Sequence, residues 1–196
     1  MKLGEDFYQR KNVLQIAQQL IGKGLFTKSN GVTTGGIIVE TEAYSWKEKG
    51  CHAYGAKKTQ RNAVMFDDGG LAYVYLCYGM HHLFNVVTNK ANVAEAVLVR
   101  ALEPLVGIEE MKLRRGLTTL DRQLTSGPGK LTKALGINRT FNGKSLLNGE
   151  IWIDDLGTKI SLRDIMASPR IGIDYAGEDA ALPWRYTLKG NKWVSK

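Results

Sequence analysis

The pattern of apolar and polar positions predicts short helices and strands that alternate along the chain. Apolar residues at helical spacing follow Asn12, which predicts a first helix over residues 13–21 with Asn12 as its N-cap and with Gly22 and Gly24 at its end. Further helices are predicted over residues 107–113 and from Lys130 onward. Apolar runs predict strands at residues 25–27, 36–39, 73–77, 83–87, 97–103, 151–153 and 184–188.

These elements lack the regular rhythm of a doubly wound sheet, so the predicted fold class is α+β. We expect a single domain over residues 1–196, with a mixed, mostly antiparallel sheet and flanking helices. The long irregular stretch over residues 45–68 is typical of a functional loop in a compact domain.

Residues 71–85 predict a protruding β-hairpin with an unusual tip. Gly79 supplies a residue that tolerates positive φ in a tight turn, but the residue before it is Tyr78, where Asn, Asp or Gly is favoured. Met80 follows. An aromatic ring at such a tip has nothing of its own to pack on, which indicates a group that is wedged or stacked against a partner. The alternative is that Tyr78 folds back onto the core.

The charge of the chain is strongly basic and unevenly distributed. It contains 27 Lys and Arg against 19 Asp and Glu, a net charge of +8. Residues 112–144 hold eight basic residues and one acid, and residues 47–61 hold five basic residues and one acid. Clustering of this kind favours a polyanionic partner, nucleic acid first, although a solvated basic surface is the alternative.

Several classes are disfavoured by what the sequence lacks. The two cysteines, Cys51 and Cys77, define no disulfide framework, and the three histidines have no second spaced set that would indicate zinc. No apolar run has the length of a membrane span, and the N-terminal segment has acids where a signal peptide needs apolar residues. We therefore expect a cytoplasmic protein (nucleoid-associated if bacterial) with no membrane association, metal or other cofactor.

Candidate chemistry lies in residues 37–44, IIVETEAY. Strand alternation puts Ile38, Glu40, Glu42 and Tyr44 on one face, with the two carboxylates roughly 7 Å apart. A carboxylate that faces a cleft can act as a general base. The same spacing also suits a glycosidase, or a structural pair that is satisfied by arginine or backbone donors.

Several motifs, in order and over about residues 3–193, resemble the alkyladenine (3-methylpurine) DNA glycosylases. They are LGEDFY, IIVETEAY, CHAY, TQRN with MF, YVYLCYGMHHLFNVV, VLVRALEPL, LTSGPGKLTKALGIN, SPRIGI and RYTLKGNKWVS. The resemblance implies an α+β domain that excises damaged purines from double-stranded DNA. The reaction is hydrolysis of the N-glycosidic bond without a metal and without a lyase step, and we expect the protein to act as a monomer.

The resemblance also implies roles for individual residues. Glu42 matches the catalytic general base, and Arg100 matches a residue that helps hold Glu42 and the attacking water. The flipped base would stack between Tyr44 and Tyr75, with His52 as the third wall and Asn85 at the pocket floor. Each of these residues also has an ordinary structural reading: Arg100 as the partner of a carboxylate, His52 as a satisfied histidine and Asn85 as a cross-strand hydrogen bonder.

The remaining matches concern DNA contacts. A base flipped out of the stack leaves a hole, and Tyr78 matches the wedge that fills it, with Gly79 and Met80 shaping the tip. Lys57 and Thr59 match positions that contact the DNA backbone. Lys130 belongs to a Gly-Pro-Gly-Lys turn that opens a helix, where free N–H groups suit a phosphate; the alternative is an ordinary helix start.

The chain departs from the family pattern at a few positions: Gln60, Asp67, Asp68 and Leu83. They leave every named pocket residue in place but change the surroundings that set its width, which bears on whether 3-methyladenine, 7-methylguanine, hypoxanthine or ethenoadenine is accepted. Two other classes stay open at this stage. One is a DNA-lesion binding protein without catalysis, and the other is a carbohydrate-active hydrolase that uses Glu40 and Glu42.

Overall fold

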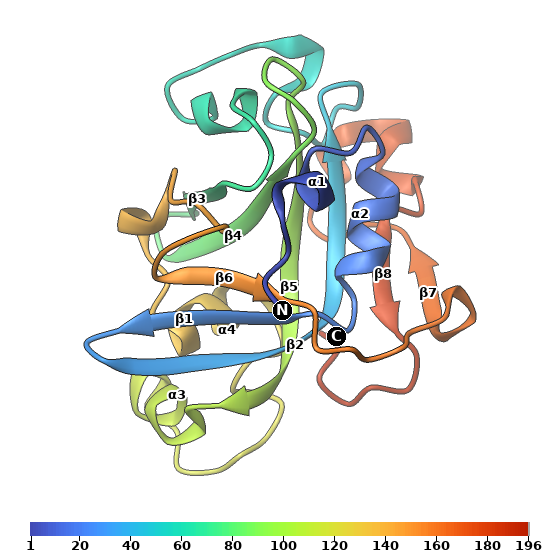
Figure 1. The fold of residues 1–196 in the computed structure, drawn as a ribbon. Coiled ribbons are helices and arrows are strands. Elements are labelled where there is room, and N and C mark those ends of the chain that lie inside the picture. The colour runs from blue at the N-terminus through green and yellow to red at the C-terminus, as the bar shows by residue number, and fades with distance from the viewer. Residues whose placement is uncertain (196) are drawn as a thin grey trace.

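The computed structural model describes residues 1–195, so that Lys196, the last residue of the predicted domain, lies outside the described residues. Its strands form one eight-stranded antiparallel sheet in the order β3-β4-β5-β2-β1-β6, with β8 beside β2 and β7 beside β8 (Figure 1). This confirms the predicted α+β class. The strands are β1 (Gly24–Ser29), β2 (Val32–Ser45), β3 (Ala72–Cys77), β4 (His81–Thr88), β5 (Glu95–Val106), β6 (Ile151–Asp154), β7 (Ile165–Ser168) and β8 (Arg185–Leu188).

The helices are short. The α-helices are α1 (Glu5–Tyr8), α2 (Val13–Leu20), α3 (Ile108–Arg115) and α4 (Pro128–Leu135). The 3-10 helices are η1 (Tyr54–Ala56), η2 (Ala63–Phe66), η3 (Arg139–Phe141), η4 (Leu162–Asp164) and η5 (Asp174–Ala181). Across residues 1–195, every helix is too short or too polar to cross a bilayer.

Strand β2 is the central element of the sheet. One of its edges pairs with β5, while its other edge is shared, first by β1 and then by β8 at Glu40–Glu42. Figure 1 shows β2 and β5 running side by side through the middle of the molecule. The β2–β5 ladder shifts register on both sides of Glu40. Such bulges re-aim side chains and are frequent beside functional sites.

Because of these two bulges, the side chains of β2 do not alternate strictly as expected. Ile38 belongs to the main apolar core, and the extra residue between Ile38 and Glu40 interrupts the ladder, so strict alternation does not carry Ile38 onto the face of the carboxylates. Contacts hold the other three together: Glu40 and Glu42 both meet Arg100, and Tyr44 meets Glu42.

The main core lies between the sheet and helices α2, α3 and α4. The side chain of Asn12 accepts a hydrogen bond from the Gln15 amide at 3.1 Å, which confirms the predicted N-cap of α2. The predicted end of this helix is half right. Gly22, with φ of 86°, follows α2 in a conformation that cannot continue the helix, whereas Gly24 is the first residue of β1.

A second, smaller core supports the site. The segment after β2, predicted to be an irregular loop, folds over the end of the sheet with the short helices η1 and η2. It buries Cys51, Met65 and Phe66 against strand residues, and Tyr44 and Tyr75 pack on this cluster. The loop is therefore the scaffold that orients two of the predicted stacking residues.

Candidate active site

A cluster of buried charges lies at the centre of the sheet, where β2 meets β5. Glu40 and Glu42 are fully buried, and both contact Arg100. The Arg100 Nε atom lies 2.9 Å from Glu40 Oε1, and its Nη1 atom lies 3.2 Å from Glu42 Oε1. Arg100 also lines the main cleft of the protein, so one guanidinium joins both carboxylates to the cleft wall.

Glu40 is fully engaged by structural partners. Besides Arg100, it accepts hydrogen bonds from Arg185 Nε at 2.7 Å and from the amide and hydroxyl of Ser195 at 2.7 and 2.8 Å. Burial alone would raise the pKa of Glu40, but the two guanidinium groups and the Ser195 amide outweigh burial and lower it. A glycosidase dyad needs two carboxylates that reach the substrate, so this arrangement argues against that alternative.

Glu42 is held directly behind the cleft wall. Its Oε2 atom accepts a hydrogen bond from the Tyr44 hydroxyl at 2.7 Å, and its Oε1 atom accepts one from the Ile171 amide at 2.9 Å. Burial, followed by the charge of Glu42, raises the pKa of Tyr44 well above its ordinary value, so Tyr44 stays a neutral donor. Glu42 has no exposed surface, whereas Tyr44, Ile171 and Arg100 line the cleft.

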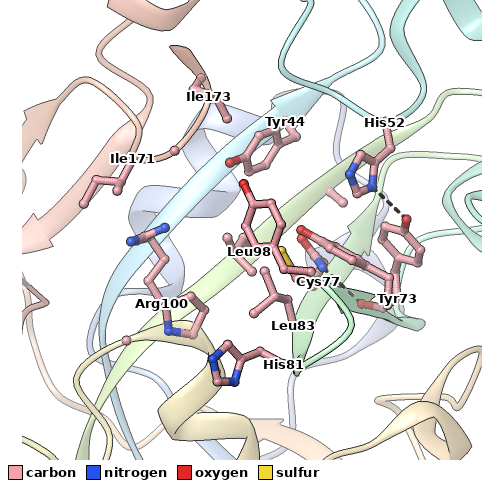
Figure 2. A pocket seen from close by; sticks show the side chains of 18 of the residues that line it. Tyr44, His52, Tyr73, Cys77, His81, Leu83, Leu98, Arg100, Ile171 and Ile173 are labelled. Carbon is pink, nitrogen blue, oxygen red and sulfur yellow. Dashed lines mark hydrogen bonds between the residues drawn. The ribbon is translucent and has the colours of Figure 1, made fainter. Parts of the chain in front are cut away.

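The cleft itself has a volume of about 800 Å³ and aromatic walls. The ring centroids of His52 and Tyr75 lie 4.6 Å apart at an interplanar angle of 71°, and the His52 Nδ1 atom is 2.9 Å from the Tyr73 hydroxyl (Figure 2). Although His52 is open to the cleft, lost hydration and then the positive charge of Arg61 lower the pKa of His52 to about 4. The ring is therefore neutral at physiological pH.

The predicted pocket residues converge on this cleft. Figure 2 shows Tyr44 and His52 on one side and Arg100 reaching in from β5. Asn85 lies on β4 opposite Tyr73 and also lines the cleft, with its Nδ2 atom donating to the Tyr73 carbonyl at 3.2 Å. Asn85 is therefore a cross-strand hydrogen bonder, and the same bond fixes its amide at the cleft surface.

The hairpin tip extends into solvent. Tyr78 is 85% exposed and Met80 is 72% exposed, so Tyr78 does not fold back onto the core. Tyr78 and Gly79 have φ of 50° and 70°, and the Met80 amide donates to the Cys77 carbonyl at 3.1 Å, the pattern of a type I′ turn. The positive φ of Gly79 was predicted, but that of Tyr78 was not.

The predicted phosphate-contacting residues fall in two places. Lys130, in the first turn of α4, lines the cleft and donates to Gln123 Oε1 at 2.6 Å. Lys57 and Thr59 are exposed in the loop after His52 and do not line the cleft. Asn62, which was not predicted, ties this loop together.

Three further residues of the site were not predicted to have a role. Arg170 and Ile171 belong to the SPRIGI motif, and they contact Tyr44 and Glu42 from the far end of the chain. Arg61 lies over the Tyr75 ring, with its guanidinium carbon 5.1 Å from the ring centroid. The motif itself was the one signal in the sequence that could have drawn attention to residues 170 and 171. Within residues 1–195, no group of three or more His, Cys, Asp or Glu side chains is arranged to hold a metal ion.

Known proteins are similar to this chain over nearly its whole length. Residues 6–192 match the family described as Methylpurine-DNA glycosylase (MPG). A relative from Carboxydothermus hydrogenoformans is 48% identical over 196 residues, covering 100% of both chains. Relatives from Chlamydia felis (47% identity over 192 residues, 97% of both chains) and Clostridium perfringens (44% over 205 residues, 100% of both) are similar as well. All three are named as inferred 3-methyladenine DNA glycosylases.

The fold, the aromatic cleft and these similarities define an enzyme of DNA repair that acts on damaged DNA. The chain belongs to the methylpurine-DNA glycosylase family and is a DNA glycosylase.

Proposed function

We propose that this enzyme turns a damaged purine nucleotide out of double-stranded DNA and hydrolyses its N-glycosidic bond with a water activated by Glu42. The observation that carries the proposal is the position of Glu42, a buried carboxylate held by three donors immediately behind an aromatic cleft. A nucleobase bound in this cleft would bring its sugar close to that carboxylate.

The extrusion step is assigned to the hairpin tip. Removing a nucleotide from the stack costs unstacking and unpairing energy, which an inserted side chain offsets by filling the gap. Tyr78 is exposed, unpacked and held in a backbone conformation that bulky residues avoid. Since fold stability does not favour a tyrosine there, its presence supports a role in contact with DNA.

The recognition step is assigned to the cleft walls. The flat base would lie between Tyr44 and Tyr75, against His52, where stacking is worth roughly 1–3 kcal/mol per base. The bulk of Asn85 at the floor would exclude the 2-amino group of normal guanine. Normal adenine is instead protected because a neutral adenine is a poor leaving group. By contrast, 3-methyladenine is cationic while it is attached to the sugar, and it therefore departs readily.

The chemical step is assigned to Glu42. The water attacks C1′ of the deoxyribose, its proton passes to the Glu42 carboxylate, and the carboxylate charge stabilises the oxocarbenium-like transition state. The Tyr44 hydroxyl, the Ile171 amide and Arg100 orient Glu42. Because Glu42 is fully buried in the free protein, we expect the water to reach it where these three residues meet at the cleft wall.

The substrates proposed are 3-methyladenine, 7-methylguanine, hypoxanthine and ethenoadenine in duplex DNA, acted on by a monomer. A panel of duplexes, each with one of these lesions, tests the proposal together with an undamaged duplex as control. We expect release of the free base and an abasic site that breaks only after alkali treatment. Absence of release from every lesion, or strand breakage before alkali, would contradict the proposed reaction.

A further inference from the structure

Both aromatic walls of the cleft carry an arginine against the ring. The Arg170 guanidinium carbon lies 4.7 Å from the Tyr44 ring centroid, and the Arg61 guanidinium carbon lies 5.1 Å from that of Tyr75. These distances are within the range of cation–π attraction. Each wall therefore already has one positive charge over it before a base enters.

Arg170 is fixed in its place. Its side chain is fully buried and pairs with Glu48 through two hydrogen bonds of 2.7 Å, while its Nη1 atom also donates to the Ala43 carbonyl at 3.0 Å. Its guanidinium also lies 5.2 Å from the Trp184 ring centroid, so it is packed between two aromatic rings. Because Arg170 is closed to solvent while Tyr44 lines the cleft, the cation covers the part of the ring that faces away from a bound base.

Arg61 acts from an exposed position. It lines the cleft, and its Nη2 atom lies 3.5 Å from the Leu76 carbonyl, a contact that leaves its positive charge uncancelled. The same charge helps to keep the third wall, His52, neutral. The cleft thus combines uncharged stacking surfaces with two nearby guanidinium groups.

We infer that Arg170 and Arg61 set the preference of the cleft toward neutral rather than cationic damaged purines. A cation over a ring attracts its π electrons and weakens the attraction of that ring for a second cation, and the two like charges also repel. Neutral bases such as hypoxanthine lose nothing by this arrangement. The inference rests on the proposed function.

The direct test is the affinity for two bases of the same shape and different charge. The probes are duplexes with one 3-methyladenine, which is cationic in the nucleotide, or one 3-deaza-3-methyladenine, which is neutral. A 2′-fluoro sugar at the lesion slows bond cleavage, and fluorescence anisotropy gives the dissociation constants. The ratio of the two constants removes all DNA contacts that both duplexes share.

The informative variants are Arg61→Gln and the double variant Glu48→Gln with Arg170→Gln, which removes the buried pair together and leaves no lone buried charge. Arg163→Gln is the matched control, since Arg163 is exposed in η4 outside the cleft. In Arg61→Gln we expect the ratio to move toward the cationic base by about threefold to tenfold, because charges roughly 8 Å apart are only partly screened. A smaller shift, about twofold to threefold, is expected in the double variant because a positive and a negative charge leave together.

An unchanged ratio in Arg61→Gln would overturn the proposal for the Tyr75 wall, and an unchanged ratio in the double variant would overturn it for the Tyr44 wall. An equal shift in Arg163→Gln would overturn it for both walls, because the effect would then reflect net charge alone. Failure of the proposed function itself has a separate signature. The unmodified protein would then bind neither lesion more tightly than undamaged duplex.

Discussion

Replacing Tyr78 with asparagine should stabilise the fold and weaken base excision at the same time. The Tyr78 ring is 85% exposed, so its loss removes little packing, but its φ of 50° is unfavourable for a bulky residue. The left-handed conformation costs about 1–2 kcal/mol for most L-residues, and asparagine tolerates it better. Tyr78→Asn also creates the favoured Asn-Gly type I′ turn. We therefore expect the free energy of unfolding to rise by about 1 kcal/mol.

The loss of activity follows from the unfilled gap in the DNA stack. Base–aromatic stacking is worth about 1–3 kcal/mol, which corresponds to a roughly 5- to 150-fold lower single-turnover rate. The rate should fall most for a hypoxanthine in a well-paired duplex, and less opposite a mismatch or in a single strand, where extrusion costs little. Tyr75→Ala, which removes a pocket wall, should instead lower the rate alike in every context.

The chain offers a matched control for the backbone effect. Asn30 and Gly31 form the β1–β2 turn with φ of 51° and 79°, nearly the values at Tyr78 and Gly79. Asn30→Tyr should therefore lower the unfolding free energy by about the amount that Tyr78→Asn raises it, with excision unchanged. Urea denaturation and single-turnover excision measure the two quantities. Equal rate losses in all DNA contexts for Tyr78→Asn would contradict the role of Tyr78 as a wedge, and a less stable protein would contradict the backbone effect.

Three further outcomes are expected. Glu40→Gln should destabilise the fold by about 3–5 kcal/mol because Arg100 loses a buried partner. Since the folded-state pKa of Glu40 is lowered, the stabilisation from its charge is present above about pH 4.5 and is lost on further acidification. Urea midpoints of this variant should therefore depend less on acid pH than those of the unmodified protein. Lys130→Ala should flatten the log–log dependence of DNA binding on salt by about 0.9, whereas exposed Lys28→Ala should not; an unchanged slope would leave Lys130 as part of an ordinary helix start. Titration of the His52 ring by NMR should show protonation only near pH 4, and a midpoint near 6.5 would contradict the environment described.

Local features of the fold could be predicted because neighbouring residues determine them. The Asn12 cap and the hairpin around Gly79 each depend on a few adjacent residues with strong backbone preferences. The ends of the elements moved by a few residues, as for the helix expected over residues 107–113, which runs over Ile108–Arg115. Short elements such as β7 gave no periodic signal and were not predicted.

The long-range parts of the site could not be predicted in the same way. Arg170 meets the ring of Tyr44, and Ile171 meets the carboxylate of Glu42, across a sequence separation of more than a hundred residues. The bulges around Glu40 arise in the pairing of β2 with β5, which alternation along one strand cannot reveal. Of the groups that hold Glu42, Arg100 was expected from the resemblance, whereas the Ile171 amide emerged only from the folded structure.

In the proposed reaction, Glu42 activates the water that releases the base. The most direct measurement is the single-turnover rate of hypoxanthine release by Glu42→Gln, with the affinity for the same duplex measured in parallel. We expect nearly unchanged affinity and a rate lower by on the order of 10²–10⁴-fold or more, because the amide neither accepts the proton nor stabilises the transition state. A rate close to that of the unmodified enzyme would contradict this role of Glu42.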